Sequence, residues 1–135
     1  MTEDLFQELK DGQTPGPFES VKQFHDWFST INNDPGQPPE NRHWLPDHVS
    51  IRFIHADIHR ANIMVSPDMK APRVLALLDW GQSGWYPEYW EYCKARHVGE
   101  LHNEWKDLAL PHIFGEALHE WFWQWHYFLE IIGRF

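Results

Sequence analysis

The stretch that most constrains the fold is residues 51–66, "IRFIHADIHRANIMVS". Two short apolar runs rich in β-branched residues enclose a polar loop, a pattern that predicts strands at about 51–54 and 62–65. A third apolar run, "RVLALLDW", predicts another strand at about 73–78. Because loops held between rigid strands often carry function, we expect the polar loop to be a functional site.

The remainder of the chain favours helices. Ser20 followed by Gln23 forms a capping box at the start of an amphipathic helix over about 20–30. No strand is predicted after Asp79. A helix is expected from about Pro87, and a long aromatic helix over 115–132 is expected to end at Gly133.

The order of these elements predicts an α+β fold that is mostly helical, with a few short strands. At 135 residues the chain is long enough for one domain. Residues 1–17 are polar and turn-rich, so we expect a flexible N-terminal segment followed by one folded unit over 18–135.

Charge and composition exclude several classes of function. The net charge of −9 argues against binding the phosphate backbone of a nucleic acid, which needs Lys and Arg. No signal peptide and no apolar run of membrane-spanning length is recognisable, so no membrane association is expected. The single cysteine, Cys93, cannot form an intrachain disulfide. A cytoplasmic location is therefore predicted.

The polar residues of the loop have a spacing that suits phosphoryl transfer. His55, Asp57 and Asn62 form the pattern HxDxxxxN, and Asp79 follows at the end of the third predicted strand. Phosphoryl transfer needs a carboxylate to receive or orient the attacking hydroxyl, and oxygen ligands that hold Mg²⁺ against the phosphates. A zinc hydrolase using His55, Asp57 and His59 as ligands is an alternative that this spacing leaves open.

The segments "HADIHRANIMV" and "LLDWGQSGWYPEYWEY" resemble the catalytic and metal-binding loops of the aminoglycoside phosphotransferase family. The flanking segments are similar to those of fungal-type members. The resemblance implies a protein-kinase-like fold, of which 18–135 would be the large, C-terminal lobe, with Mg²⁺ and ATP as cofactors. It also implies that Asp57 is the catalytic carboxylate and that Asn62 and Asp79 are Mg²⁺ ligands.

The same resemblance bears on the neighbouring residues. His59 occupies a place where related kinases keep a phosphate-contacting lysine, so it is either a second catalytic residue or part of the loop framework. His55 is expected to hold the loop by hydrogen bonding. Ala56 stands where the family usually has glycine. The implied acceptor is a small-molecule hydroxyl, and for a cationic acceptor Trp85, Tyr86 and Glu88 are the candidate contacts.

One expected element has no counterpart in the sequence. No glycine-rich GxGxxG motif precedes Ile51, and the only lysines before it are Lys10 and Lys22. We therefore expect the small nucleotide-binding lobe to be absent, and a truncated large lobe to have little or no activity alone. The alternative is a non-catalytic kinase-like remnant that binds a protein partner on its interlobe face, a role that suits the nine tryptophans.

Overall fold

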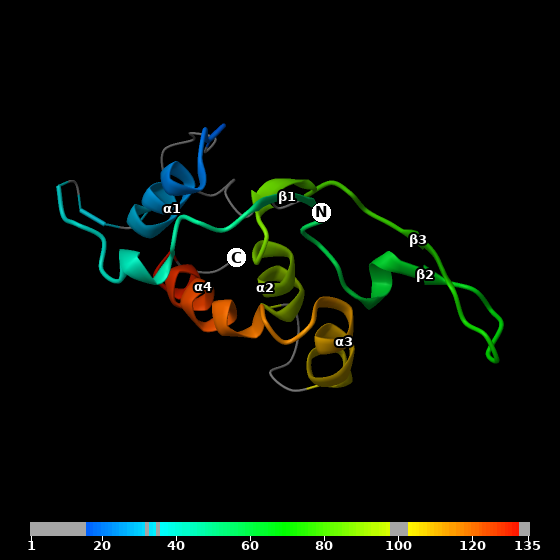
Figure 1. Ribbon diagram of the computed structural model, residues 1–135. Helices are drawn as coiled ribbons and strands as arrows, with labels where there is room; N and C mark the ends of the chain where they lie inside the picture. Colours follow the sequence, from blue (N-terminus) through cyan, green and yellow to red (C-terminus); the bar gives the residue numbers. More distant parts are fainter. Residues whose placement is uncertain (1–15, 32, 35, 98–102, 133–135) are drawn as a thin grey trace.

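The computed structural model describes residues 16–31, 33–34, 36–97 and 103–132 (Figure 1). Helices and a few short strands make up the fold, and the predicted α+β class is confirmed. The elements are α1 (Val21–Thr30), η1 (Arg42–Trp44), β1 (Ile51–Ile54), η2 (Arg60–Asn62), β2 (Ile63–Val65), β3 (Val74–Leu77), β4 (Gly84–Pro87), α2 (Trp90–His97), η3 (Trp105–Ala109), α3 (Leu110–Phe114) and α4 (His119–Ile132).

Helix α1 forms as the sequence predicts. Phe24 and Phe28 lie one turn apart on its buried face. The Ser20 hydroxyl caps the helix by accepting a hydrogen bond from the Gln23 backbone N–H at 3.2 Å. The Gln23 side chain in turn accepts from the backbone N–H of Glu19 at 2.8 Å, one residue before the expected partner.

The strands form two separate antiparallel pairs. β1 pairs with β4, with Ile51 opposite Pro87, and β2 pairs with β3 in a hairpin, with Ile63 opposite Leu77. The three predicted strands are confirmed to within one residue at each end. β1 and β2 are neighbours along the chain but belong to different sheets, so the loop between them joins two parts of the molecule (Figure 1).

The prediction that no strand follows Asp79 was wrong. Residues 84–87 form β4, and Pro87, expected in the first turn of a helix, is the last residue of that strand. Helix α2 begins only at Trp90. The four residues of β4 are extended because β1, at least thirty residues earlier, supplies their hydrogen-bond partners. Proline is tolerated there because both strands of a two-stranded sheet are edges.

The C-terminal helices also differ from the prediction. The expected helix over 115–132 begins at His119, because Gly115 takes a left-handed φ of 76° and ends the preceding helix. That preceding helix, α3, and the single π-helical turn η3 were not predicted. The expected helix end at Gly133 and most of the N-terminal segment 1–17 lie outside the described residues.

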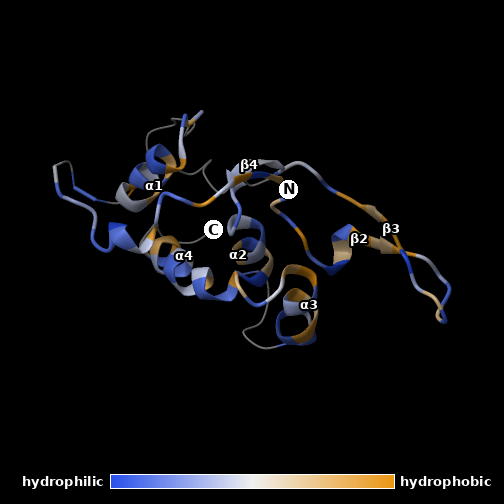
Figure 2. Cartoon of the chain, viewed as in Figure 1, coloured by the Kyte–Doolittle hydropathy of each residue, from blue (hydrophilic) through white to orange (hydrophobic). Residues whose placement is uncertain are grey.

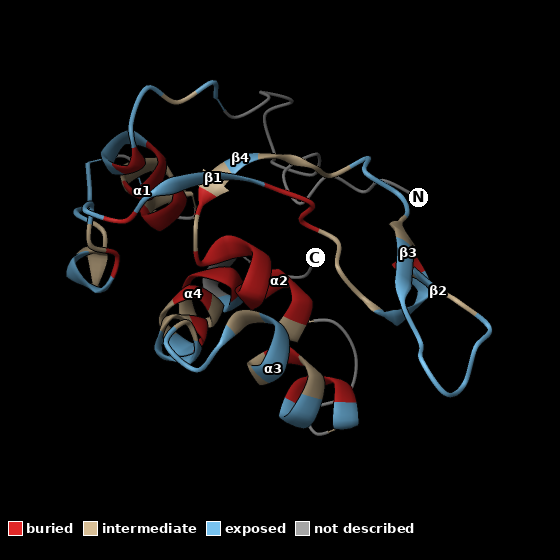
Figure 3. Ribbon diagram, turned by 45° about the vertical axis from the view of Figure 1, so that its right-hand side comes forward, coloured by how far each residue is buried: buried red, intermediate tan, exposed pale blue. Residues whose placement is uncertain are grey.

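The core lies among α1, α2 and α4, whose facing sides are buried (Figure 3). Trp90 is its centre, with its ring 5.3 Å from those of Phe24 and Phe28 and 5.6 Å from that of Trp125. Cys93 is fully buried in the same core, and burial raises the pKa of its thiol, as expected for a packing residue.

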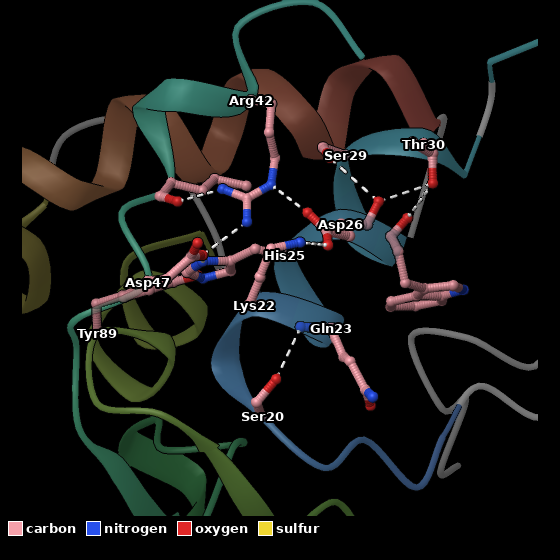
Figure 4. Close-up of polar contacts among 12 residues, drawn as sticks. Ser20, Lys22, Gln23, His25, Asp26, Ser29, Thr30, Arg42, Asp47 and Tyr89 are labelled. Carbon is pink, nitrogen blue, oxygen red and sulfur yellow. Dashed lines mark hydrogen bonds and ion pairs between the residues drawn. The ribbon is translucent and has the colours of Figure 1, made fainter. Parts of the chain in front are cut away.

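A polar cluster fixes the start of α2 against α1 (Figure 4). The ring of His25, which is fully buried, contacts Asp47 Oδ1 at 3.2 Å through Nδ1 and the Tyr89 hydroxyl at 2.7 Å through Nε2. Arg42 donates to Asp26 at 2.8 Å and to Asp47 at 2.6 Å. Tyr89 immediately precedes α2, so this cluster ties the first turn of that helix to α1 and to the loop after η1.

The β2–β3 hairpin extends away from the helices (Figure 1). Its strands are hydrophobic, yet most of their residues are exposed (Figures 2 and 3). The polar loop between β1 and β2 therefore lies at the junction of the helical body and the hairpin. None of the helices in the described ranges is long and apolar enough to cross a membrane.

Candidate active site

Three predicted site residues come together in the loop between β1 and β2. The Asn62 side-chain Nδ2 donates to the backbone oxygen of Asp57 at 2.9 Å and to its carboxylate Oδ2 at 3.1 Å. The same nitrogen lies 3.1 Å from His59 Nε2. The turn η2 makes this convergence possible because it brings Asn62 back over the residues at the start of the loop.

These contacts fix the orientation of the Asn62 amide. A backbone carbonyl and a carboxylate can only accept, so the nitrogen of the amide must face Asp57 and its oxygen is left to face a cation. His59 Nε2 is 3.7 Å from Asp57 Oδ2, longer than its contact with Asn62.

Both ring nitrogens of His55 form hydrogen bonds within the loops. Its Nδ1 accepts from the Asp57 backbone N–H at 3.2 Å, and its Nε2 contacts the Leu78 carbonyl oxygen at 2.8 Å, which requires the proton on Nε2. Neither nitrogen is left for a metal. Within the described part of the chain, no group of three or more His, Cys, Asp or Glu side chains could hold a metal ion, so the zinc alternative finds no support.

The residue that sequence reasoning missed is Glu91, on α2. Its carboxylate is buried and accepts two backbone N–H groups of the loop over 55–62, named the catalytic loop for the role that the resemblance implies, from His55 at 2.6 Å and from Ala56 at 2.9 Å. One carboxylate thus holds the first two residues of the loop. A signal was present in the sequence, because Glu91 is an acidic residue within the aromatic stretch "EYWEYC".

The environment of Glu91 combines two opposing influences. Burial raises the pKa of its carboxyl above the ordinary 4.5, while the N–H groups of His55 and Ala56 limit that rise. Ala56 takes a left-handed φ of 64°, the conformation for which glycine, the usual family residue, is suited. The bond from Glu91 offsets part of the cost of that conformation.

Asp79 lies in the neighbouring loop. It is exposed and has a left-handed φ of 59°. Leu78, just before it, donates its N–H to the Asn62 backbone oxygen at 2.8 Å and accepts from His55, which attaches this loop to the catalytic loop. Among the described residues, the structure records no hydrogen bond or ion pair from the Asp79 carboxylate to Asp57 or Asn62.

The donor set fits a hard cation. Asp57 and Asp79 offer carboxylate oxygens and Asn62 offers an amide oxygen, and these are the ligand types that Mg²⁺ takes in proteins. They come from two loops that are hydrogen-bonded to each other through Leu78. Asn62 and Asp79 are therefore the residues that could hold Mg²⁺, with Asp57 beside them.

The expected contacts for a cationic acceptor do not gather around one space. Trp85 and Tyr86 are adjacent on β4, so their side chains point to opposite faces. Trp85 is 73% exposed, whereas Tyr86 stacks on Trp90 at 5.6 Å within the core. Glu88 lies 3.9 Å from Arg52 in a solvent-exposed ion pair. Trp85 alone among the three candidates presents an exposed ring.

The model for the phosphotransferase enzyme family matches residues 34–126, more than two-thirds of the chain. The chain belongs to this family. The searches of curated proteins and of solved structures found no match.

Membership of the phosphotransferase enzyme family agrees with the arrangement of the two loops. The matched range contains β1 to β4, the loop cluster of Asp57 and Asn62, Asp79, and the whole of α2 with Glu91. The family suggests a phosphotransferase, and the small α+β structure is consistent with a kinase-like family domain.

Proposed function

We propose that the chain is a phosphotransferase that uses ATP and Mg²⁺ to transfer phosphate to a small-molecule hydroxyl in the cytoplasm. The observation that carries this proposal is the contact between Asp57 and Asn62 in a loop pinned by a buried carboxylate. In such a loop a carboxylate and a metal-ligand oxygen lie side by side, which is the arrangement that phosphoryl transfer requires. Residues 18–135 would form a kinase-like large lobe of the fungal type.

The residues have separate roles in this proposal. Asp57 Oδ2 is engaged by Asn62, so Oδ1 is the oxygen that would accept the proton of the attacking hydroxyl. Asn62 and Asp79 would hold Mg²⁺, which when bound neutralises phosphate charge. His59, beside Asp57, would contact the phosphoryl group as the second catalytic residue.

The glycine-rich cover of a nucleotide is not among these 135 residues. Groups that position the phosphates supply much of the rate enhancement in phosphoryl transfer. We therefore propose that this stretch binds Mg²⁺ by itself but transfers phosphate slowly or not at all unless a nucleotide-binding lobe is supplied.

Metal titration tests the proposal. Mg²⁺ binding, measured calorimetrically with and without ATP, is expected for the wild type and for Asp68→Asn, an exposed carboxylate on the hairpin loop. Asp79→Asn and Asn62→Ala are expected to lose it, because each removes a ligand oxygen or its charge. Equal binding by wild type and Asp79→Asn would overturn the assignment.

A second candidate function rests on the exposed hairpin. Met64, Val65, Val74 and Leu75 are each between 46% and 65% exposed, so the hairpin beside the catalytic loop presents apolar side chains to solvent. A non-catalytic interaction module would use this surface to bind a protein partner, such as a separately encoded nucleotide-binding lobe. Replacing Val65 and Val74 by Ser would then abolish partner capture while leaving Mg²⁺ binding unchanged. Capture that survives these changes would exclude the hairpin surface.

A further inference from the structure

Helix α2 carries a second buried charge one turn after Glu91. The Lys94 side chain lies within the protein with only 9% of the residue exposed, and its Nζ donates to the Gln82 side-chain Oε1 at 2.8 Å. Burying an ammonium is costly unless it is hydrogen-bonded, so this contact is not incidental. Gln82 belongs to the loop that begins with Asp79.

The two charges on α2 thus reach two different loops. Glu91 holds the backbone of His55 and Ala56, and Lys94 holds the side chain of Gln82. The residues are three apart, so they lie on the same side of the helix. The helix can therefore fix the distance between the catalytic loop and the loop over 79–83, named the metal-binding loop for its proposed role.

We propose that Lys94 is a positioning residue that holds the loop over 79–83, through Gln82, in the conformation in which Asp79 can share a divalent cation with Asn62. This role rests on the proposed function, because it assumes that Asp79 is a metal ligand. Lys94 itself touches neither substrate nor metal in this proposal.

The loop over 79–83 needs a residue that holds its conformation because much of it is exposed to solvent. Asp79, Trp80 and Gly81 are exposed, and Asp79 has an unfavourable left-handed φ. At its other end the loop is closed by a turn in which Ser83 donates to the Trp80 carbonyl oxygen. A loop ordered in advance binds a cation more tightly, because the ordering entropy is not lost on binding.

The experiment compares Lys94→Met, Lys94→Arg, Gln82→Ala and the double variant Lys94→Met/Gln82→Ala. Mn²⁺, replacing Mg²⁺, is titrated and followed by electron paramagnetic resonance, and amide hydrogen exchange is measured over 79–83. Loss of one hydrogen bond predicts an affinity about fivefold lower in Lys94→Met and in Gln82→Ala. The double variant is expected to match the single variants, because both remove the same contact.

Two controls separate positioning from a general loss of stability. Lys94→Arg retains a buried donor and is expected to bind Mn²⁺ within about twofold of the wild type. Lys106→Met removes another buried lysine, in η3, and is expected to leave both Mn²⁺ affinity and exchange over 79–83 unchanged. In Lys94→Met, exchange should rise over 79–83 and stay unchanged at Ala56 and Asp57.

The outcomes distinguish this inference from the proposed function. A wild type that binds no Mn²⁺ overturns the proposed function, and exchange over 79–83 then still decides whether Lys94 holds the loop. A wild type that binds Mn²⁺, with unchanged affinity in Lys94→Met and Gln82→Ala, overturns the role of Lys94 alone. Independent effects that multiply in the double variant also overturn it.

Discussion

The loop over 55–62, proposed to be catalytic, and the loop over 79–83, proposed to bind metal, are attached to the same helix in different ways. The first has buried residues at both ends, and its backbone N–H groups are held directly by the Glu91 carboxylate. The second is largely exposed, and α2 reaches it through one side chain, Gln82. Both contain a non-glycine residue with positive φ, Ala56 in one and Asp79 in the other.

The two loops obtain their conformations from different contacts. The catalytic loop is rigid, because buried hydrogen bonds fix its backbone whether or not a ligand is present. The metal-binding loop is held at its ends, by the Trp80 ring, which lies 4.7 Å from that of His55, and by the bond from Lys94 to Gln82. Changes in the first should therefore affect stability, and changes in the second should affect cation affinity.

The largest expected effect is that of Glu91→Ala. The substitution leaves the N–H groups of His55 and Ala56 buried without acceptors, and we expect a loss of about 3 kcal/mol in the free energy of unfolding. Urea denaturation measures it. Glu88→Gln is the control, because its ion pair with Arg52 is long and exposed, and a change below about 0.5 kcal/mol is expected. Similar losses in both variants would contradict direct support of the loop by Glu91.

Asn62→Asp tests the interior of the catalytic loop. It puts a carboxylate against Asp57 and removes the donor to the Asp57 backbone oxygen, so we expect a loss of about 2 kcal/mol at pH 7. Lower pH or added Mg²⁺ should recover much of that loss, because each relieves the repulsion between the two carboxylates.

Thermal unfolding with and without Mg²⁺ measures this recovery. Asn103→Asp is the matched control: its side-chain oxygen accepts from the Lys106 backbone N–H, a bond that aspartate can also accept. It should show neither the loss nor the recovery by Mg²⁺. Failure of Mg²⁺ to stabilise Asn62→Asp more than the wild type would argue against a cation beside Asp57.

The buried His25, which supports the start of α2, predicts that the stability of the protein depends on pH. Burial lowers the pKa of His25 below 6.5, although its bond to Asp47 opposes this. The unfolded chain therefore binds a proton at a higher pH than the folded chain, and stability should fall as pH drops below 6.5, by at most about 1.4 kcal/mol per pH unit. Above 6.5 this contribution is complete.

His25→Gln should reduce the slope of stability against pH between 6.5 and the lowered pKa. A residual slope should persist, because burial also lowers the pKa of His97. His43→Gln, on an exposed ring, is the control and should leave the slope unchanged. An unaltered slope in His25→Gln would contradict a neutral, buried His25 between Asp47 and Tyr89.

The elements that the sequence predicted well are those with local signals. α1 has its cap at Ser20 and its apolar face within ten residues, and β1 was placed at its observed bounds. The cluster of Asp57, His59 and Asn62 was also predictable, because all three residues lie in one eight-residue loop. Such patterns require no knowledge of distant parts of the chain.

The features that were missed depend on partners far along the chain. β4 is a strand because of β1, and Glu91 matters because it reaches N–H groups at least 35 residues earlier. Pro87 is compatible both with the end of an edge strand and with the start of a helix, so its identity alone could not decide between them. The bond from Lys94 to Gln82 has no local signature either.

The smallest expected effect tests the strain at Ala56. Ala56→Gly removes a buried methyl group, which lowers the free energy of unfolding by about 0.8 kcal/mol. Glycine also gives the unfolded chain more conformational entropy, which lowers the free energy of unfolding by up to about 1 kcal/mol more. Relief of a left-handed alanine returns about 1–2 kcal/mol, so these terms largely cancel and a net change of at most about 1 kcal/mol is expected. Ala95→Gly is equally buried but lies inside α2, so it has no strain to relieve and should lose about 1–2 kcal/mol.

The difference between these two Ala→Gly changes isolates the backbone term, since residue types and burial are matched. Urea denaturation of both variants and the wild type measures it. If Ala56→Gly lowers the free energy of unfolding as much as Ala95→Gly does, then the left-handed conformation of Ala56 is not strained. The bond from Glu91 to the Ala56 N–H would then stabilise a turn that is not strained. The greater rigidity of the catalytic loop, compared with the metal-binding loop, would in that case come from its hydrogen bonds alone.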